Sequence, residues 1–178
     1  MGDSVRKGER LLVGEGMAVW AADKPGGLIL EFADEAVCEA AFRIQQLLER
    51  HAVPTGFVER LGSRILLARR LELLPVEVVI EAAPGQVDVA FRAGGRTLDR
   101  AEAESLLTPD RLERIEDLAA HAARSLRAHL SLRGIAHLRA RLRFGLTEDG
   151  ACLLQVVNPL ECELGSTDMR QVAELLGG

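Results

Sequence analysis

Short apolar segments joined by tight turns open the chain and predict an antiparallel sheet. Residues 10–15 and 17–21 are β-prone and are separated by a turn that contains Gly14 and Gly16. A Lys-Pro-Gly-Gly turn then leads into a third apolar segment at 28–32. Runs of this length bounded by glycine and proline are typical of strands in a meander.

A change of spacing marks the first helix. After Asp34, a residue type that favours helix N-caps, apolar positions recur every three or four residues as far as His51. Two further strands are predicted at 57–61 and 64–73, joined by a Gly-Ser turn. The pattern therefore predicts one amphipathic helix packed against an antiparallel sheet.

The second half of the chain also mixes strand and helix patterns. A helix is predicted from the Thr108-Pro109 start signal to near Gly134, and a shorter one near 167–176. The predicted strands are 76–82, 86–92, 96–98, 135–146 and 152–157. This order of elements predicts an α+β fold.

Pro75 marks the predicted crossing between two lobes. Proline has no backbone donor for a strand ladder and holds the residue before it extended. We therefore predict an N-terminal antiparallel β lobe with one helix at residues 1–73 and a C-terminal α+β lobe at 74–178.

Composition narrows the classes of function. The 178 residues carry a net charge of −5, which gives no general attraction to nucleic acid or to anionic membranes. No apolar run approaches the roughly 20 residues of a membrane helix, and the polar start of the chain lacks a signal peptide's apolar core. A cytoplasmic location is expected. Cys38, Cys152 and Cys162 are too few and too far apart to suggest a disulfide framework or a zinc site.

Common catalytic motifs do not emerge from the sequence. The four histidines lack metal-ligand spacing, and no serine lies in a G-x-S-x-G motif. Lys7 and Lys24 are the only lysines, so chemistry that needs a lysine in mid-chain is excluded. Trp20, the only tryptophan, is expected in the core.

Six segments follow one another in an order that resembles a known family. They are LLVGEGMAVW (11–20), LILEFADE (28–35), VPTGFVERL (53–61), ILLARRLELLPVEVVIEA (65–82), GIAHLRARLRFG (134–145) and VVNPLECELGSTD (156–168). Together they resemble SAICAR synthetase (phosphoribosylaminoimidazole-succinocarboxamide synthase), the ATP-dependent amide ligase of purine synthesis. The resemblance implies a two-lobe fold, shortened here, with ATP and Mg²⁺ bound between the lobes.

The nucleotide site implied by this resemblance is degenerate. The family's GKxK lysines, which meet nucleotide phosphates, correspond to Glu15 and Met17, and the acid would repel a phosphate. The hinge that contains Arg69 and Leu73 keeps the family pattern and would present backbone groups to an adenine.

Groups for substrate and metal also depart from the family pattern. Glu81 and Glu163 stand where the family has arginines, the first of which is expected to hold an anionic substrate. Gln155 and Val156 stand where it has acidic metal ligands. Because Mg²⁺ prefers carboxylates together with water and phosphate oxygens, no bound metal is expected.

Three arginines form the most distinctive positive feature. Arg139, Arg141 and Arg143 share one face of the predicted strand 135–146, where they would read a small anion if that face lines the cleft between the lobes. Alternatively, the face is solvated and balanced by nearby acids such as Glu161 and Glu163, and Glu81 and Glu163 are the expected salt-bridge partners of the arginines. The candidate ligand-binding residues are Arg139, Arg141, Arg143, Glu81, Glu163 and Gln155.

These features predict a SAICAR-synthetase-like pseudoenzyme without ATP, Mg²⁺ or any other cofactor. It would act as a non-catalytic partner or regulatory subunit, or bind a small anionic ligand, in a purine-like or specialised biosynthetic pathway. A protein partner or a homo-oligomer, such as a homodimer, is expected. The alternative is an ATP-dependent amide ligase with a rebuilt active site that uses ATP and Mg²⁺.

Overall fold

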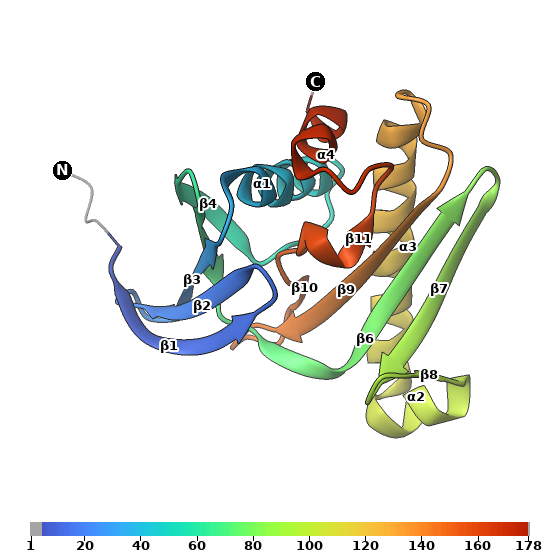
Figure 1. The fold of residues 1–178 in the computed structure, drawn as a ribbon. Helices are drawn as coiled ribbons and strands as arrows, with labels where there is room; N and C mark the ends of the chain where they lie inside the picture. Colours follow the sequence, from blue (N-terminus) through green and yellow to red (C-terminus); the bar gives the residue numbers. More distant parts are fainter. Residues whose placement is uncertain (1–4, 178) are drawn as a thin grey trace.

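Two antiparallel sheets and four helices build the structure, a computed structural model that describes residues 5–177 (Figure 1). The strand order of the first sheet is β1-β2-β3-β5-β4. Its strands are β1 (Lys7–Gly14), β2 (Met17–Ala22), β3 (Gly27–Phe32), β4 (Phe57–Gly62) and β5 (Ile65–Arg69). The α+β class and the opening meander are confirmed.

The second sheet contains the longer strands. Its order is β10-β9-β6-β7-β8, and β11 pairs with the part of β9 that β10 leaves open. Its strands are β6 (Glu72–Ala83), β7 (Gln86–Ala93), β8 (Arg96–Leu98), β9 (Leu138–Leu146), β10 (Cys152–Leu154) and β11 (Cys162–Glu163). All pairs between named strands are antiparallel.

The helices begin at capping residues. The Asp34 side chain accepts a hydrogen bond from the first turn of α1, and Thr108 does the same for α3. The helices are α1 (Glu35–Arg50), α2 (Arg100–Leu106), α3 (Pro109–Ser131) and α4 (Met169–Leu176), with a 3₁₀ turn, η1 (Pro159–Glu161). Within residues 5–177, none of the helices is both long and apolar enough to cross a membrane.

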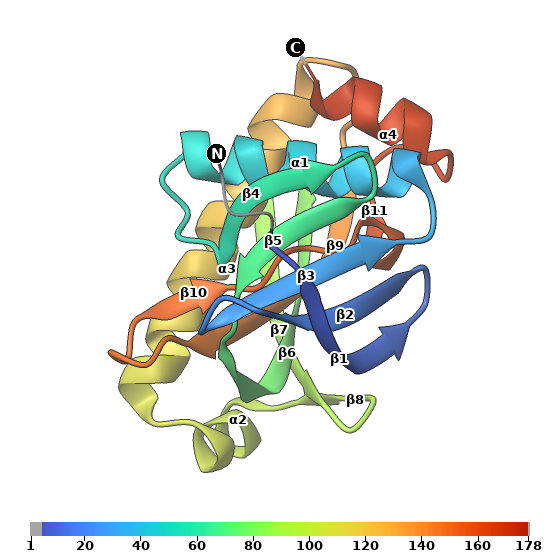
Figure 2. The same cartoon turned by 90° about the vertical axis from the view of Figure 1, so that its left-hand side faces the viewer.

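Helix α1 belongs to two hydrophobic cores. Val37, Cys38 and Ala41 pack in the core of the first sheet. Ile44 and Leu48 pack in the larger core between the second sheet and α3. Figure 2 shows α1 running across the first sheet, and it contacts both α3 and α4. Separation of the two sheets would therefore expose apolar surface on this one helix.

The crossing between the sheets differs from the prediction. β5 ends at Arg69 rather than at residue 73, and β6 already includes Pro75. The register of β6 against β9 shifts between Leu73 and Glu77. Because proline cannot donate to the ladder, this irregularity accommodates Pro75 inside a strand.

The two sheets approach closely at this crossing. A side chain at Gly145 would come within 2.6 Å of Leu71 Cβ and 2.9 Å of the Glu72 carbonyl oxygen, so only glycine fits there. The proposed boundary between residues 73 and 74 lies inside β6. The division into lobes 1–73 and 74–178 stays a prediction, and residues 1–4 and 178 of it lie outside the described residues.

Several other element ends are corrected. The strand predicted at 135–146 begins at Leu138, and the one predicted at 152–157 ends at Leu154, where the chain turns toward η1. Helix α2 was not predicted. Its seven residues bury only Ala103, so they carry little periodicity, and the Asp99–Glu102 capping box is its clearest signal.

Trp20 does not lie in the core, contrary to the prediction. Strand alternation buries its neighbour Val19 and turns Trp20 to the opposite, half-exposed face of the first sheet. Its ring lies 5.1 Å from Lys7 Nζ and 5.7 Å from the Arg10 guanidinium carbon, and its indole nitrogen donates to Glu31. At the surface, two cations therefore contact the face of the tryptophan ring, and a carboxylate accepts the hydrogen bond of its indole N–H.

Replacing Ile44 with alanine tests whether α1 couples the two sheets. Ile44 is fully buried, so Ile44→Ala should lower the free energy of unfolding by about 2–5 kcal/mol. Denaturant unfolding followed by Trp20 fluorescence and by far-UV circular dichroism should give coincident midpoints. The control Leu132→Ala, at a side chain that is 83% exposed, should change stability by less than about 0.5 kcal/mol. Separate midpoints for the two probes would contradict the coupling.

Candidate functional site

Strand β9 places the three predicted arginines on one face. Leu142 and Phe144 are each 1% exposed and face the core, so alternation turns Arg139, Arg141 and Arg143 to the other side of the sheet. The exposed fraction of the side chain rises from 31% for Arg143 to 48% for Arg139. Electrostatic contacts are therefore least screened by water at the Arg143 end.

Neighbouring strands supply acidic partners for this face. Glu77 of β6 lies opposite Arg143 in the strand register. Glu81 lies opposite Arg139 on one side, and Glu163 of β11 lies opposite the same arginine on the other. Arg139 Nε lies 3.1 Å from Glu81 Oε1, and a terminal nitrogen of Arg139 lies 3.9 Å from Glu163 Oε1. The pairing of Glu81 and Glu163 with the arginines that the sequence suggested is therefore present.

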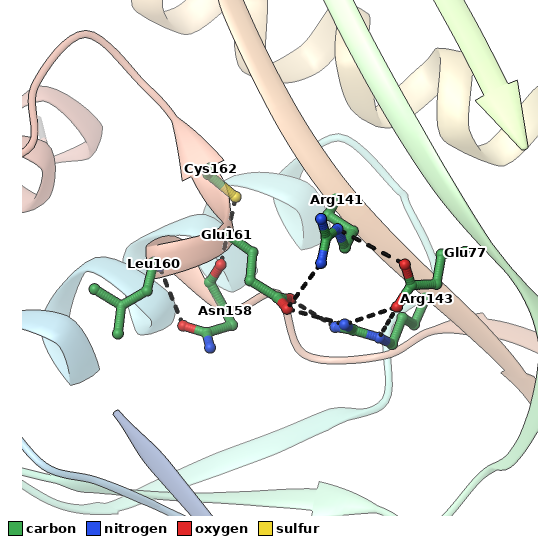
Figure 3. A network of polar contacts seen from close by, with 7 residues as sticks. All are labelled: Glu77, Arg141, Arg143, Asn158, Leu160, Glu161 and Cys162. Carbon is green, nitrogen blue, oxygen red and sulfur yellow. Dashed lines mark hydrogen bonds and ion pairs between the residues drawn. The ribbon is translucent and has the colours of Figure 1, made fainter. Parts of the chain in front are cut away.

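Arg143 makes the strongest contacts of the group (Figure 3). Its two terminal nitrogens donate to both oxygens of Glu161, at 2.6 and 2.9 Å. Its Nε donates to Glu77 at 3.1 Å. The Glu161 hydrogen bonds, against the effect of burial, raise the pKa of Arg143 above its ordinary value. A bidentate guanidinium–carboxylate pair of this kind fixes both partners in one geometry.

Arg141 is held much more loosely. Its nitrogens lie 3.7 Å from Glu77 and 3.7 Å from Glu161, beyond the usual range of a hydrogen bond. Figure 3 shows its guanidinium between these two carboxylates, both of which are bonded to Arg143. We call the set of Arg139, Arg141, Arg143, Glu77, Glu81, Glu161 and Glu163 the ionic cluster.

The η1 segment that carries Glu161 is fixed from within. The side-chain oxygen of Asn158 accepts a hydrogen bond from the Leu160 backbone N–H at 3.1 Å. The Cys162 thiol donates to the Asn158 carbonyl oxygen at 3.5 Å. Burial raises the pKa of Cys162 to about 12, so this thiol stays protonated and is a poor nucleophile. These contacts present Glu161 to the arginines.

Leu160 connects η1 to the first sheet. It lies against Gly16 at the tip of the β1–β2 hairpin, where a side chain could be added only if the end of Leu160 moved aside. Gly16 also has φ +68°, a conformation that glycine adopts without cost. The segment therefore touches the second sheet through Glu161 and the first sheet through Leu160.

Two cavities lie beside the ionic cluster. The larger, of about 1130 Å³, lies between the ends of β6, β7 and β9 and the segment from η1 to α4. The smaller, of about 280 Å³, lies over the middle of the same sheet face. Arg139, Leu160 and Glu163 line both, so the two cavities adjoin each other.

Residues predicted for the degenerate nucleotide site are dispersed. Glu15 is exposed in the β1–β2 turn, Met17 is half-buried at the start of β2, and Arg69 is exposed at the end of β5. Leu73 is 48% exposed in β6. None of the four lines either of the two cavities. Gln155 follows β10, and its backbone N–H donates to the Arg143 carbonyl at 2.8 Å, so it supports β9 through the main chain.

The carboxylates of the ionic cluster do not fit a magnesium ion. Glu77 and Glu161 accept hydrogen bonds from Arg143, whose positive charge opposes a second cation nearby. Mg²⁺ requires near-octahedral oxygen ligands, and Gln155 and Val156 supply no carboxylate. In the described part of the chain, no group of three or more His, Cys, Asp or Glu side chains could hold a metal ion.

Three residues of this region were not among the candidates predicted from the sequence. Glu77 could have been found, because period-two alternation along β6 puts it on the same face as Glu81. Arg92 of β7 lines the smaller cavity. Alternation along β7 puts Arg92 on this face only once it is known that β7 lies beside β6. Glu161 was expected only as a nearby acid that balances the arginines, and its bidentate bond to Arg143 could not be predicted because its three-residue 3₁₀ turn has no sequence period.

Comparison with known proteins supports the resemblance in sequence. No model of a known protein family matches the chain. Phosphoribosylaminoimidazole-succinocarboxamide synthase from Acidithiobacillus ferrooxidans is 33% identical over 127 residues, which are 58% of this chain and 52% of that protein. The chain thus spans about half the length of that relative. The synthase of the same name from a Synechococcus species is 25% identical and aligns with 88% of this chain and 79% of its own length.

Solved structures share the fold. The synthase of this name from Ehrlichia chaffeensis superposes with a TM-score of 0.78 at 18% identity, covering 94% of this chain and 98% of that one. A SAICAR synthetase in complex with ADP gives a TM-score of 0.73 at 19% identity, covering 82% of this chain and 79% of that one. The arrangement of two sheets is therefore that of these enzymes.

A double-mutant cycle tests the central pair of the ionic cluster. Arg143→Gln, Glu161→Gln and the double variant should give a coupling free energy of about 1–2 kcal/mol, because the pair is bidentate and mostly shielded from water. Denaturant unfolding supplies the free energies. The matched control is the exposed helical pair Arg100–Glu104, for which the coupling should be smaller. Equal couplings for the two pairs would show that Arg143 does not fix η1.

Proposed function

The chain belongs to the SAICAR synthetase family, whose members are ATP-dependent ligases, and we propose that it is a pseudoenzyme of this family. In this proposal the two-sheet scaffold is retained while the ATP, magnesium and substrate chemistry is lost. The protein then acts as a non-catalytic partner or regulatory subunit, or as a binder of a small anion, in a purine-like or specialised biosynthetic pathway.

The ionic cluster is the observation that carries this proposal. Phosphoryl transfer depends on cations placed where negative charge develops in the transition state. Arg143 has its guanidinium bonded to Glu161 and Glu77 instead. Release of this arginine toward a phosphate would leave two carboxylates without their partner, which is costly for groups that are mostly shielded from water. The cluster is therefore more consistent with a scaffold than with a phosphate-transfer site.

The resemblance in sequence adds a second line of support. A carboxylate of the family's metal-binding motif corresponds to Gln155, and a lysine of its phosphate-binding hairpin corresponds to Glu15. An amide is a poor replacement for an acidic ligand of Mg²⁺, and a carboxylate repels phosphate. These two changes and the ionic cluster all remove groups that phosphoryl transfer from Mg-ATP requires.

A rebuilt ligase is the second candidate. Its support is the extent of the shared scaffold, since the structure covers 98% of the Ehrlichia chaffeensis synthase chain. In that case Arg141, the loosely held arginine, would replace a lysine at the reacting groups. This candidate requires that ATP binds in the presence of Mg²⁺.

A homodimer is the partner arrangement that the surface favours. Strand β1 is an edge strand of the first sheet, and an edge strand offers unpaired backbone donors and acceptors. It also exposes Leu11, Leu12 and Val13 at 42%, 59% and 63%. Self-pairing of two copies through this edge would satisfy the ladder and bury the three apolar side chains, with the symmetry typical of dimers.

Nucleotide binding separates the pseudoenzyme from the ligase. Mg-ATP, up to millimolar concentrations, should leave the melting temperature of the protein unchanged, and incubation with ATP, aspartate and an aminoimidazole nucleotide should release no ADP. A ligand at 100 times its Kd would stabilise the fold by about 2.7 kcal/mol, which a thermal scan detects readily. A full-length ligase of the family serves as the positive control. Mg²⁺-dependent stabilisation by ATP would refute the pseudoenzyme proposal and favour the rebuilt ligase.

Mass measured by light scattering across a concentration series tests the dimer. The wild-type protein should approach twice its monomer mass of 19.3 kDa, and Leu12→Glu should shift it toward the monomer, because a charge would then be buried in the interface. The control Leu132→Glu places the same charge on an exposed side chain at the end of α3 and should leave the mass unchanged. A wild-type protein that stays monomeric throughout would contradict the arrangement.

A further inference from the structure

The smaller cavity beside the ionic cluster has a basic lining. It lies over Val79 in the middle strand β6, with arginines on the strands at either side and η1 and β11 as its wall. The charged lining residues are Arg92, Arg139, Arg141, Glu161 and Glu163. Arginine provides planar groups of donors that suit phosphate and carboxylate oxygens.

Arg92 of β7 lines the cavity on the side opposite β9. Its terminal nitrogen donates to the Gly95 carbonyl at 2.6 Å, which anchors the guanidinium to the β7–β8 turn. Its Nε is buried and has no hydrogen-bond partner among the described residues. Because this Nε is buried, the guanidinium meets an anion in the cavity through its terminal nitrogens, of which one donates to Gly95.

Arg141 supplies the second available cation. Both of its contacts to carboxylates are 3.7 Å long, whereas Arg143 is bonded at 2.6–3.1 Å to the same two glutamates. Glu77 and Glu161 are therefore committed to Arg143, and Arg141 keeps its donors for another acceptor. Arg143 does not line the cavity. It therefore has a structural role, whereas Arg141 faces the open space.

From this geometry we propose that the smaller cavity binds a small oxyanion, a phosphate or short carboxylate group, between Arg92 and Arg141. The proposal deepens the anion-binding part of the proposed function and rests on it. A volume of about 280 Å³ lies just under the range of pockets that enclose drug-sized ligands, so the cavity suits a single anionic group rather than a nucleoside triphosphate.

Acids at the rim set the selectivity of this site. Glu163 is 78% exposed and, among the described residues, its one ion pair is the 3.9 Å contact with Arg139, so its charge is largely uncompensated at the cavity mouth. It disfavours a second negative group at that point. One anionic group is therefore preferred over a chain of several, such as a polyphosphate, and removal of this acid should tighten anion binding.

Calorimetric titration with inorganic phosphate and with acetate, both in EDTA, tests the site. The wild-type protein should bind at least one of these anions, and the tighter one identifies the chemical class of the natural ligand. Arg92→Gln and Arg141→Gln should each weaken binding by about tenfold or more, as expected for the loss of a charge-assisted hydrogen bond. Glu163→Gln should strengthen it.

The matched control removes the same charge outside the cavity. Arg96 of β8 is 63% exposed and pairs with Glu102, so Arg96→Gln should leave the anion affinity unchanged. Circular dichroism verifies that each variant is folded. The proposal is overturned if neither anion binds at millimolar concentration, or if Arg92→Gln and Arg141→Gln bind as the wild type does. Because EDTA removes Mg²⁺ and no ATP is present, this result is independent of the nucleotide experiment that tests the pseudoenzyme.

Discussion

The bidentate contact between Arg143 and Glu161 is the interaction on which the rest of this site depends. It joins β9, an inner strand of the second sheet, to a 3₁₀ turn whose other contacts are the local hydrogen bonds of Asn158 and the packing of Leu160. Once Glu161 is fixed, Leu160 is directed to the hairpin of the first sheet and β11 is aligned along β9. Arg143 also donates to Glu77. Because both glutamates are bonded to Arg143, Arg141 lies no closer than 3.7 Å to either of them.

Beneath this surface, α1 makes the two sheets mechanically dependent on each other. Its side chains divide between two cores, with Cys38 in one and Ile44 in the other. A two-lobe fold with a ligand between the lobes needs some freedom of movement across the cleft. Here both the buried helix and the polar contact at η1 restrict that freedom, one from the core and one from the surface.

The sequence could predict what regular alternation determines. The arginines of β9 and the glutamate of β6 at position 81 follow a period of two, so their common face is readable without coordinates. Glu161 was expected as a nearby balancing acid, but its bidentate contact with Arg143 could not be predicted, because a three-residue turn has no period and the contact is tertiary. Trp20 was misassigned because residue type suggested burial, whereas the alternation with Val19 already indicated the opposite face. The exposure of a large aromatic side chain depends on nearby cations that only the fold brings together.

The contact between Gly16 and Leu160 has a consequence for motion. Enzymes with a hinged cleft commonly close over their ligand and thereby exclude water. In this protein the hairpin tip already rests on Leu160, and a methyl group at Gly16 would displace the end of that side chain. Leu160 is 41% exposed and flexible, so it yields more easily than packed backbone would. Further closure of the hairpin over the second sheet therefore begins with the movement of this one leucine.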